Sequence, residues 1–266
     1  MSTLAYALAD GVVVAKRNII KIRRVPELLV WTIMSPIMFV LLFGYVFGGS
    51  IEVPGGYREY LAAGIFAQTV IFGSTFTGVG MAEDMQKGII DRFKSLPMAR
   101  SAVLVGRTVS DVGTNAISIV VMSVTALLIG WRINTGVIDA LWGYLLLLMF
   151  AFAISWIMAF VGLMVSTPEA VSNASFMFIF PLTFVANTFV LSDALPGPLQ
   201  TFAEWNPVSS LAQAVREAFG NVNPAISNPD SWPLQHAEFY TLLWIGIILV
   251  VFVPLSTRLY KRSTSK

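Results

Sequence analysis

One segment between two apolar runs carries a dense group of ionisable side chains that could take part in chemistry. The segment holds Glu83, Asp84, Lys87, Asp91, Arg92, Lys94, Arg100 and Arg107. Its apolar residues recur at helical spacing, at Met85, Ile89, Phe93 and Leu96. The pattern predicts a short amphipathic helix, with the two acids in its first turn and Pro97 at its end. A partner could bind its apolar stripe in a groove. The alternative is a solvated loop whose charges only set membrane topology.

The sequence lacks the motifs of common catalytic and nucleotide-binding sites. There is no cysteine, which excludes disulfides, a thiol nucleophile and cysteine-based metal sites. The patterns G-x-x-x-x-G-K-[ST], G-x-S-x-G and H-E-x-x-H are also absent. The single histidine, His236, is interpreted as an ordinary loop residue. We therefore expect no catalytic residue, no metal site and no bound cofactor in this chain, and no nucleic-acid partner.

The composition indicates an all-α integral membrane protein. Of the 266 residues, 56% are hydrophobic and only 12% are charged, about half the share in soluble domains. A membrane helix needs about 20 apolar residues, and six stretches qualify. The predicted spans are 28–47, 61–81, 109–129, 141–165, 174–191 and 240–259. We expect one transmembrane domain over residues 1–266.

The distribution of basic residues predicts which side each loop faces. Five Lys or Arg precede the first predicted span, five lie between the second and third, and four lie at the C-terminal end, from Arg258 onward. Only Arg58, Arg132 and Arg216 fall on the other side. By the positive-inside rule, we expect a protein of the cell membrane whose termini and charged segment lie on the cytoplasmic side.

Ionisable residues are nearly absent from the predicted spans, which disfavours an ion-coupled carrier. The one candidate for such a role is Asp111, four residues after Arg107 and near the cytoplasmic end of the third span. It has two interpretations, a boundary acid beside a basic neighbour or a member of a proton relay. The membrane part thus shows no energy source of its own.

Two further segments outside the spans have helical patterns. Residues 1–27 contain an amphipathic stretch, Leu4 to Arg24, that suits a helix in the cytoplasmic interface or a plain soluble helix. Asn206 can cap a helix that starts at Pro207 and stops at Gly220. This second helix has an apolar and a polar face, and the predicted topology puts it at the outer leaflet, before the sixth span.

Two motifs resemble ABC-2 type transporter permeases, with the daunorubicin-resistance-type multidrug and lipid exporters as the closest subgroup. The segment EDMQKGIIDRFKSLPMARSAVLVGR is similar to the first cytoplasmic loop of that family. The matching positions are Glu83 or Asp84, Lys87–Gly88, Asp91, Leu96–Pro97, Arg100 and Gly106–Arg107. The stretch WNPVSSLAQAVREAF resembles the family's segment before the last span, at Asn206–Pro207 and Ala214–Arg216. Ile89–Ile90 departs from the family, which often has Thr-Leu there.

The resemblance implies two permeases, either two copies of this chain or this chain with a relative, and two cytoplasmic ATP-binding subunits that carry ATP and Mg. It implies a coupling helix at about 84–96, where the residues expected to contact the ATPase are Asp84, Lys87, Gly88, Ile89, Asp91, Arg92 and Phe93. The expected substrate path along spans one, two and five is assigned to Phe39, Phe43, Phe72, Phe76, Phe176, Phe180 and Asn187.

The predicted function is therefore export of a hydrophobic or amphipathic drug or lipid by an ATP-driven complex. A permease for an envelope polysaccharide or polymer, and a passive channel or membrane scaffold, remain as alternatives. Gly44 and Gly48 form a G-x-x-x-G step, which predicts a contact between the first spans of two permeases.

Overall fold

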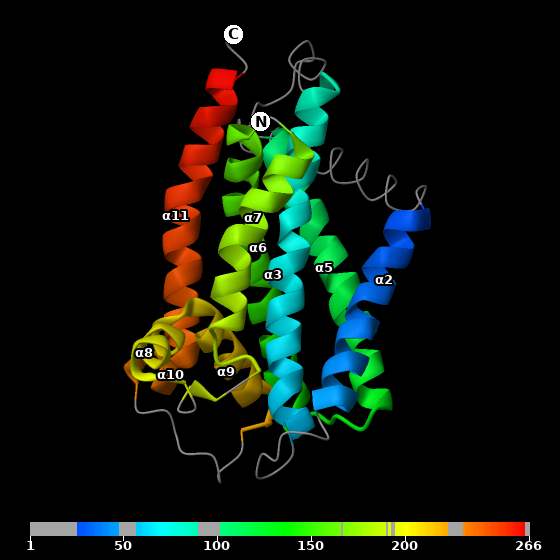
Figure 1. Ribbon diagram of the computed structural model, residues 1–266, viewed down its shortest axis with the longest axis vertical. Coiled ribbons are helices and arrows are strands. Elements are labelled where there is room, and N and C mark those ends of the chain that lie inside the picture. The colour runs from blue at the N-terminus through cyan, green and yellow to red at the C-terminus, as the bar shows by residue number, and fades with distance from the viewer. Residues whose placement is uncertain are drawn as a thin grey trace.

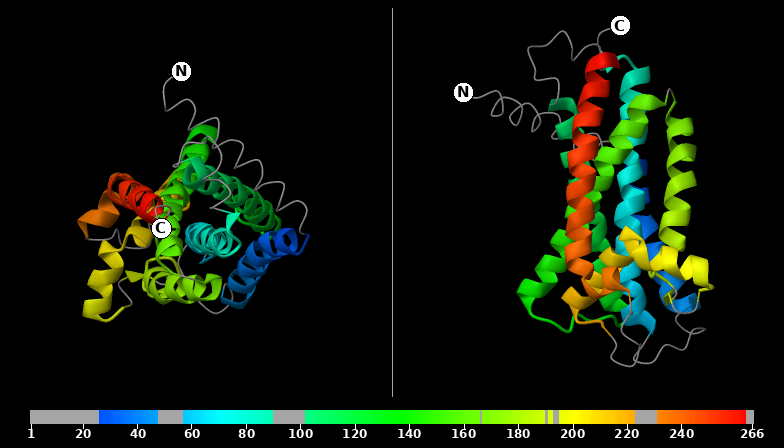
Figure 2. Two further views of the ribbon diagram at one scale, coloured as in Figure 1. Left: turned by 90° about the horizontal axis from the view of Figure 1, so that it is seen from above. Right: turned by 90° about the vertical axis from the view of Figure 1, so that its left-hand side faces the viewer.

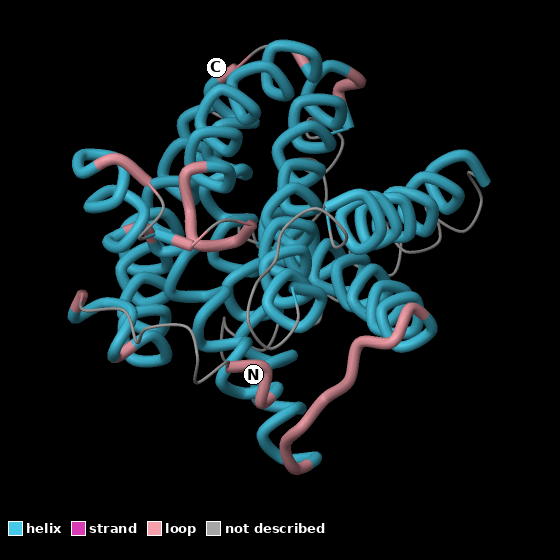
Figure 3. Tube along the Cα trace, turned by 60° about the horizontal axis from the view of Figure 1, so that its bottom comes forward, coloured by secondary structure: helices cyan, strands magenta, loops and turns pink. Residues whose placement is uncertain are grey.

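The computed structural model describes residues 26–47, 57–89, 102–165, 167–189, 191–192, 195–222 and 231–263. Within these ranges the chain is helical, with short turns and no strand (Figure 3). This confirms the predicted all-α fold. The predicted interfacial helix at residues 1–27 lies almost entirely outside the described ranges.

The helices follow the predicted spans, with shifted ends. They are α2 (Pro26–Leu41), the π-helix η1 (Leu42–Phe47), α3 (Tyr57–Gln86), α5 (Ala102–Leu128), α6 (Val137–Met164), α7 (Pro168–Phe184), α8 (Gly197–Trp205), α9 (Pro207–Phe219), α10 (Trp232–Gln235) and α11 (Ala237–Ser263). Among the described helices, α3, α5, α6 and α11 are long and apolar enough to cross a bilayer. Since α2 and α7 have only 16 and 17 residues, six spans stay a prediction.

The fifth predicted span, 174–191, was placed too late in the chain. Helix α7 begins at Pro168, because Thr167 caps it by accepting a hydrogen bond from the Ala170 amide at 3.2 Å. It ends at Phe184, and the segment that follows leaves the helical path. Apolar composition alone does not reveal this end.

The long helices lie side by side along the longest axis of the molecule (Figure 1). The short helices α8, α9 and α10 gather at one end, beside the start of α11. The last residues of α3 and α11 and the turn between α6 and α7 lie at the opposite end (Figure 1). Seen end-on, α3 is surrounded by α2, α5, α6 and α7 (Figure 2).

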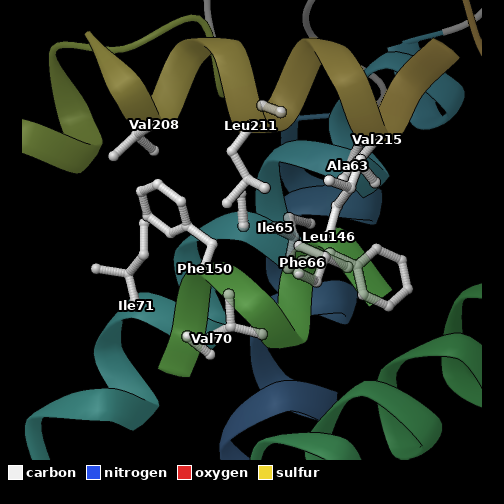
Figure 4. Packing of buried hydrophobic residues seen from close by; sticks show 14 of the residues in the cluster. Ala63, Ile65, Phe66, Val70, Ile71, Leu146, Phe150, Val208, Leu211 and Val215 are labelled. Carbon is white, nitrogen blue, oxygen red and sulfur yellow. The ribbon is translucent and has the colours of Figure 1, made fainter. Parts of the chain in front are cut away.

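The core is built by α3, α6 and α9. Phe66 of α3, Phe150 of α6 and Val215 of α9 are almost completely buried, and all three lie in the packed region of Figure 4. Lipid tails are as apolar as these side chains, so close packing contributes more than exclusion of water. A Cβ added to Gly162 of α6 would lie 2.4 Å from the carbonyl oxygen of Gly78 on α3. The backbones of the two central helices therefore touch.

Helix α9 forms as its sequence predicts. The Asn206 side chain accepts a hydrogen bond from the Val208 amide at 2.9 Å, and Gly220 ends the helix in the left-handed conformation, with φ of +66°. The polar face is largely enclosed, because Ser209, Ser210 and Arg216 are buried as well. Helix α9 packs against α3, α6 and α11, so both of its faces are covered within the chain.

Candidate functional site

A continuous series of phenylalanine rings runs along α2, η1 and α7. We call it the aromatic array and define it as Phe39, Phe43, Phe72, Phe176, Phe180, Phe184 and Phe189. On α7, Phe176, Phe180 and Phe184 follow one another at helical spacing, with ring centroids 5.6 and 5.5 Å apart. Four-residue spacing puts these rings on one side of the helix.

The array joins elements that are far apart in the sequence. The Phe189 ring contacts Phe184 at 5.8 Å and stacks on Phe43 of η1 at 4.5 Å. Phe72 brings in α3, with its ring 5.4 Å from that of Phe180. The array thus spans the first, second and fifth predicted spans.

The array is apolar and partly open. Phe176 is 37% exposed and Phe180 is 47% exposed, whereas Phe189 is buried. Residues 28–47 and 170–189 contain no Asp, Glu, Lys or Arg. Such a surface can hold apolar or aromatic groups by packing and ring stacking, but it has no charge to bind an ion.

Five of the seven residues predicted to line a path belong to the array, and two do not. Phe76 of α3 is 57% exposed and lies one turn beyond Phe72. Asn187 is buried, and its side-chain oxygen accepts a hydrogen bond from the Tyr60 hydroxyl. Asn187 is therefore bonded to α3 and α9 and is not one of the array's rings. The path prediction missed Phe184, which the four-residue spacing after Phe176 and Phe180 could have indicated.

The segment that follows α7 is held by an arginine of α9. Arg216 is 1% exposed, and its guanidinium lies 3.7 Å from the centre of the Tyr60 ring. It donates hydrogen bonds to the carbonyl oxygens of Tyr60 at 2.9 Å, Asn187 at 2.6 Å and Thr188 at 3.3 Å. In the count of basic residues, Arg216 was one of three outside the predicted spans on the non-cytoplasmic side. In the structure it is buried and bonds the segment after α7.

Asn206 makes a second connection between α9 and α7. Besides capping α9, its amide nitrogen donates to the carbonyl oxygens of Leu182 at 2.7 Å and Val185 at 2.9 Å. The last carbonyls of a helix have no partner within the helix. One side chain thus satisfies the end of α7 and the start of α9.

At the opposite end, the predicted coupling residues begin on α3. Glu83 and Asp84 lie in the last turn of α3, and the expectation that they start a new helix is wrong. The Met85 periodicity continues that of α3, and Gly88, with φ of +62°, turns the chain after it. Lys87 is exposed, with its Nζ 3.4 Å from a Glu83 carboxylate oxygen.

The remaining coupling residues are only partly within the structure. Asp84 is buried, while Gly88 and Ile89 are half-buried at the end of α3. Asp91, Arg92 and Phe93 lie outside the described residues. The contact of these seven residues with an ATPase stays a prediction.

A polar seam joins α3 to the first turns of α5. The seam consists of Gly73, Thr77 and Gly80 on α3 and Arg107, Asp111 and Asn115 on α5. The Thr77 hydroxyl donates to an Asp111 carboxylate oxygen at 2.5 Å, and Arg107 Nε lies 3.5 Å from the same oxygen. This pairing with Arg107 is what the interpretation of Asp111 as a boundary acid predicts. The pairing does not test whether Asp111 belongs to a proton relay.

The first glycine of the predicted subunit contact is buried within the chain. A Cβ added to Gly44 would lie 2.8 Å from the terminal methyl group of Ile129. The close packing of Gly44 against Ile129 therefore explains why position 44 holds a glycine. Gly48 lies outside the described residues, so the contact between two permeases stays a prediction.

Comparisons with known proteins agree with this architecture. The model of the ABC-2 type transporter family matches residues 11–219. The chain is 30% identical to a daunorubicin resistance ABC transporter permease protein of Streptomyces coeruleorubidus, over 94% of this chain and 85% of that protein. It is 25% identical to a probable doxorubicin resistance ABC transporter permease protein of Mycobacterium tuberculosis, over 87% and 81%.

A more distant relative is a putative transport permease of the alga Pyropia yezoensis, at 22% identity over 78% of this chain and 72% of that protein. The family model covers well over half of the chain, and the matching region includes the aromatic array, the polar seam and α9. The chain is a multi-pass membrane protein that belongs to the ABC-2 type transporter permease family.

Proposed function

We propose that this chain is the permease subunit of an ATP-driven exporter that moves a hydrophobic or amphipathic drug or lipid out of the cytoplasm or the inner leaflet. The aromatic array carries this proposal, because it offers a partly exposed, uncharged aromatic surface along three helices. A polar polysaccharide would need hydrogen-bonding groups that the rings do not supply. Relatives named for daunorubicin and doxorubicin resistance support the same class of cargo.

The energy would come from a separate subunit. No phosphate-binding loop is present in the sequence, so ATP and Mg belong to a cytoplasmic ATP-binding partner, present in two copies. A second permease, this chain or a relative, completes the complex. The segment 84–96 docks on the partner, and ATP-driven closure shifts the permeases between inward-open and outward-open states.

The basic residues support the orientation of this complex. With both termini and the segment after α3 in the cytoplasm of the cell, α8, α9 and α10 face outward. The array then lies between a cytoplasmic coupling end and an outer end closed by α9. This direction suits a cargo that enters from the inner leaflet.

The test is transport by the reconstituted complex. The chain is purified with the ATP-binding subunit that accompanies it, placed in proteoliposomes, and assayed for ATP-dependent movement of a fluorescent anthracycline. We expect movement that needs both subunits and falls in Phe180→Ala, whose ring is central to the array. Phe178→Ala is the matched control, since Phe178 is 70% exposed and outside the array as defined.

Three results would overturn the proposal. Anthracycline movement without ATP would favour a passive channel. Absence of any co-purifying ATP-binding subunit would favour a membrane scaffold. Stimulation of ATP hydrolysis by a polysaccharide, with no response to anthracycline or lipid, would favour the polymer permease.

A further inference from the structure

We infer that Arg107 is a positioning residue that transmits motion of the coupling segment to the cargo-facing part of α3. The inference rests on the proposed function and deepens it. It concerns two hydrogen bonds that cross between α3 and α5 in opposite directions. Together with the Arg107–Asp111 contact they form what we call the brace, made of Phe76, Thr77, Arg107 and Asp111.

The brace has two contacts that cross between the helices. Arg107 Nη2, on α5, donates to the carbonyl oxygen of Phe76, on α3, at 2.9 Å. The Thr77 hydroxyl, on α3, donates to the Asp111 carboxylate on α5 at 2.5 Å. The side chains of Arg107 and Asp111 are only 12% and 9% exposed. Hydrogen bonds to charged groups in such surroundings are strong and hold a defined geometry.

Helix α3 is shaped to receive the arginine. A Cβ added to Gly80 would lie 1.7 Å from Arg107 Nη2, so any larger residue would occupy the place of the guanidinium. Gly73, two turns earlier on α3, makes similar room for Asn115 of α5, whose side-chain oxygen would lie 2.3 Å from an added Cβ. The two glycines let polar groups of α5 reach the backbone surface of α3.

The position of the brace suggests its role. Helix α3 ends at Gln86, inside the predicted coupling segment 84–96, and α5 begins at Ala102, a few residues after that segment. Arg107 is in the second turn of α5. Phe76 is 57% exposed and lies one turn from Phe72 of the aromatic array. A movement of the segment would therefore move α3 and α5 together, because the brace joins these two helices next to the array.

A purely stabilising ion pair would need only the contact within α5. Arg107 and Asp111 are four residues apart on one helix, and pairs at this spacing stabilise that helix alone. The bonds to Phe76 and from Thr77 add nothing to α5 by itself, but they fix its rotation and height against α3. Loss of the cross-helix bonds should therefore affect coupling more than folding.

The decisive experiment uses Gly80→Ala in the purified complex with its ATP-binding subunit. The added methyl group displaces the flexible end of Arg107 and leaves every charge in place. We expect assembly and basal ATP hydrolysis near the parental values. Anthracycline moved per ATP hydrolysed should fall about tenfold, the order expected when a charged hydrogen bond is lost. Gly113→Ala is the matched control on α5, because its added Cβ would meet nothing within 4 Å.

Thr77→Val is the second variant, since it removes the hydroxyl from the other cross-helix bond and keeps the shape of the side chain. It decides the matter if Gly80→Ala fails to assemble. Transport per ATP at the parental level in the variants that assemble would overturn the inference, and so would an equal fall in Gly113→Ala. A parental complex without ATP-dependent transport would instead refute the proposed function.

Discussion

The ring of Phe43 lies nearly parallel to the ring of Phe189, with centroids 4.5 Å apart and planes inclined by 13°. Phe43 belongs to η1, at the end of the first predicted span, and Phe189 follows α7. This contact joins the ring series of the first span to that of the fifth. The aromatic array is continuous because of it.

The stack predicts a measurable coupling between two distant positions. Phe43→Leu and Phe189→Leu should each lower the thermal stability of the purified protein, and the double variant should lose less than the sum. Aromatic pairs contribute about 1 kcal/mol beyond the area they bury. A double-mutant cycle of melting temperatures measures this difference, and strictly additive losses would show that the rings do not interact.

Replacement of Arg216 should destabilise the end of the fold at which α8, α9 and α10 gather. In Arg216→Met, three carbonyl oxygens lose the hydrogen bond from the guanidinium, and the Asn187 oxygen keeps only its bond from the Tyr60 hydroxyl at 3.3 Å. A buried polar group left without a partner costs about 1 to 3 kcal/mol. Arg216→Lys should recover only part of the loss, because one ammonium group cannot match the geometry of the guanidinium. Melting temperatures in detergent check the order of stability of the parental protein, Arg216→Lys and Arg216→Met. Arg258 is exposed, so Arg258→Met is a control that should stay near the parental value.

The two roles of Asn206 can be separated by substitution. Asn206→Ser keeps an oxygen to cap α9 but removes the amide donors to Leu182 and Val185. Asn206→Ala removes both, so it should cost about 1 kcal/mol more than the serine variant, the usual value of an N-cap. Equal melting temperatures for the two variants would mean that only the end of α7 depends on this residue.

The coupling segment is tested by a charge placed on its apolar stripe. Phe93 lies outside the described residues, and its role as an anchor for the ATP-binding subunit comes from periodicity and family resemblance. Truncating an interface aromatic commonly costs about 2 kcal/mol or more, roughly thirtyfold in affinity. Phe93→Glu should therefore abolish co-purification of the ATP-binding subunit, whereas Lys94→Glu should not. Parental binding and transport in Phe93→Glu would leave the segment as topology charge only.

Gly44 provides a test of packing within the chain. Gly44→Ala places a methyl group 2.8 Å from Ile129, and such overpacking costs about 1 to 3 kcal/mol. Ile129→Val removes the methyl group that is in the way, so the double variant should recover stability. The predicted contact between two permeases is tested separately by crosslinking first spans in Gly48→Leu. A reduced yield supports the G-x-x-x-G contact, and an unchanged yield removes it.

The sequence predicted the elements well where local signals act along one helix. The cap at Asn206, the stop at Gly220 and the long apolar runs of α3, α6 and α11 are such signals. The early end of α7 was missed, because carbonyls at its end are satisfied by Asn206, and the Asn187 carbonyl that follows is satisfied by Arg216. Both residues come more than twenty positions later in the chain. No periodicity within the fifth span encodes that relationship.

The residue types of the aromatic array could be predicted from the sequence, but the contacts between its rings could not. Aromatic residues in three spans indicated Phe43, Phe72 and Phe180, yet the role of Phe189 as the junction depends on the turn after α7. The seam was seen only as a boundary acid, Asp111, beside a basic neighbour. Its partners on α3 are a hydroxyl and a backbone carbonyl, which have no distinctive sequence pattern.

The touching backbones of Gly78 and Gly162 have a mechanical consequence. An added Cβ at Gly162 would lie 2.9 Å from the Cα atom of Gly78, so the contact has no room for a side chain. A rotation or slide that brought a larger neighbouring residue into this contact would cause a steric clash. We expect α3 and α6 to behave as one stiff rod during the transport cycle. Rearrangement must then come from elements that pack around the rod, such as α2 and α7, and spin labels on α3 and α6 should keep a constant separation throughout.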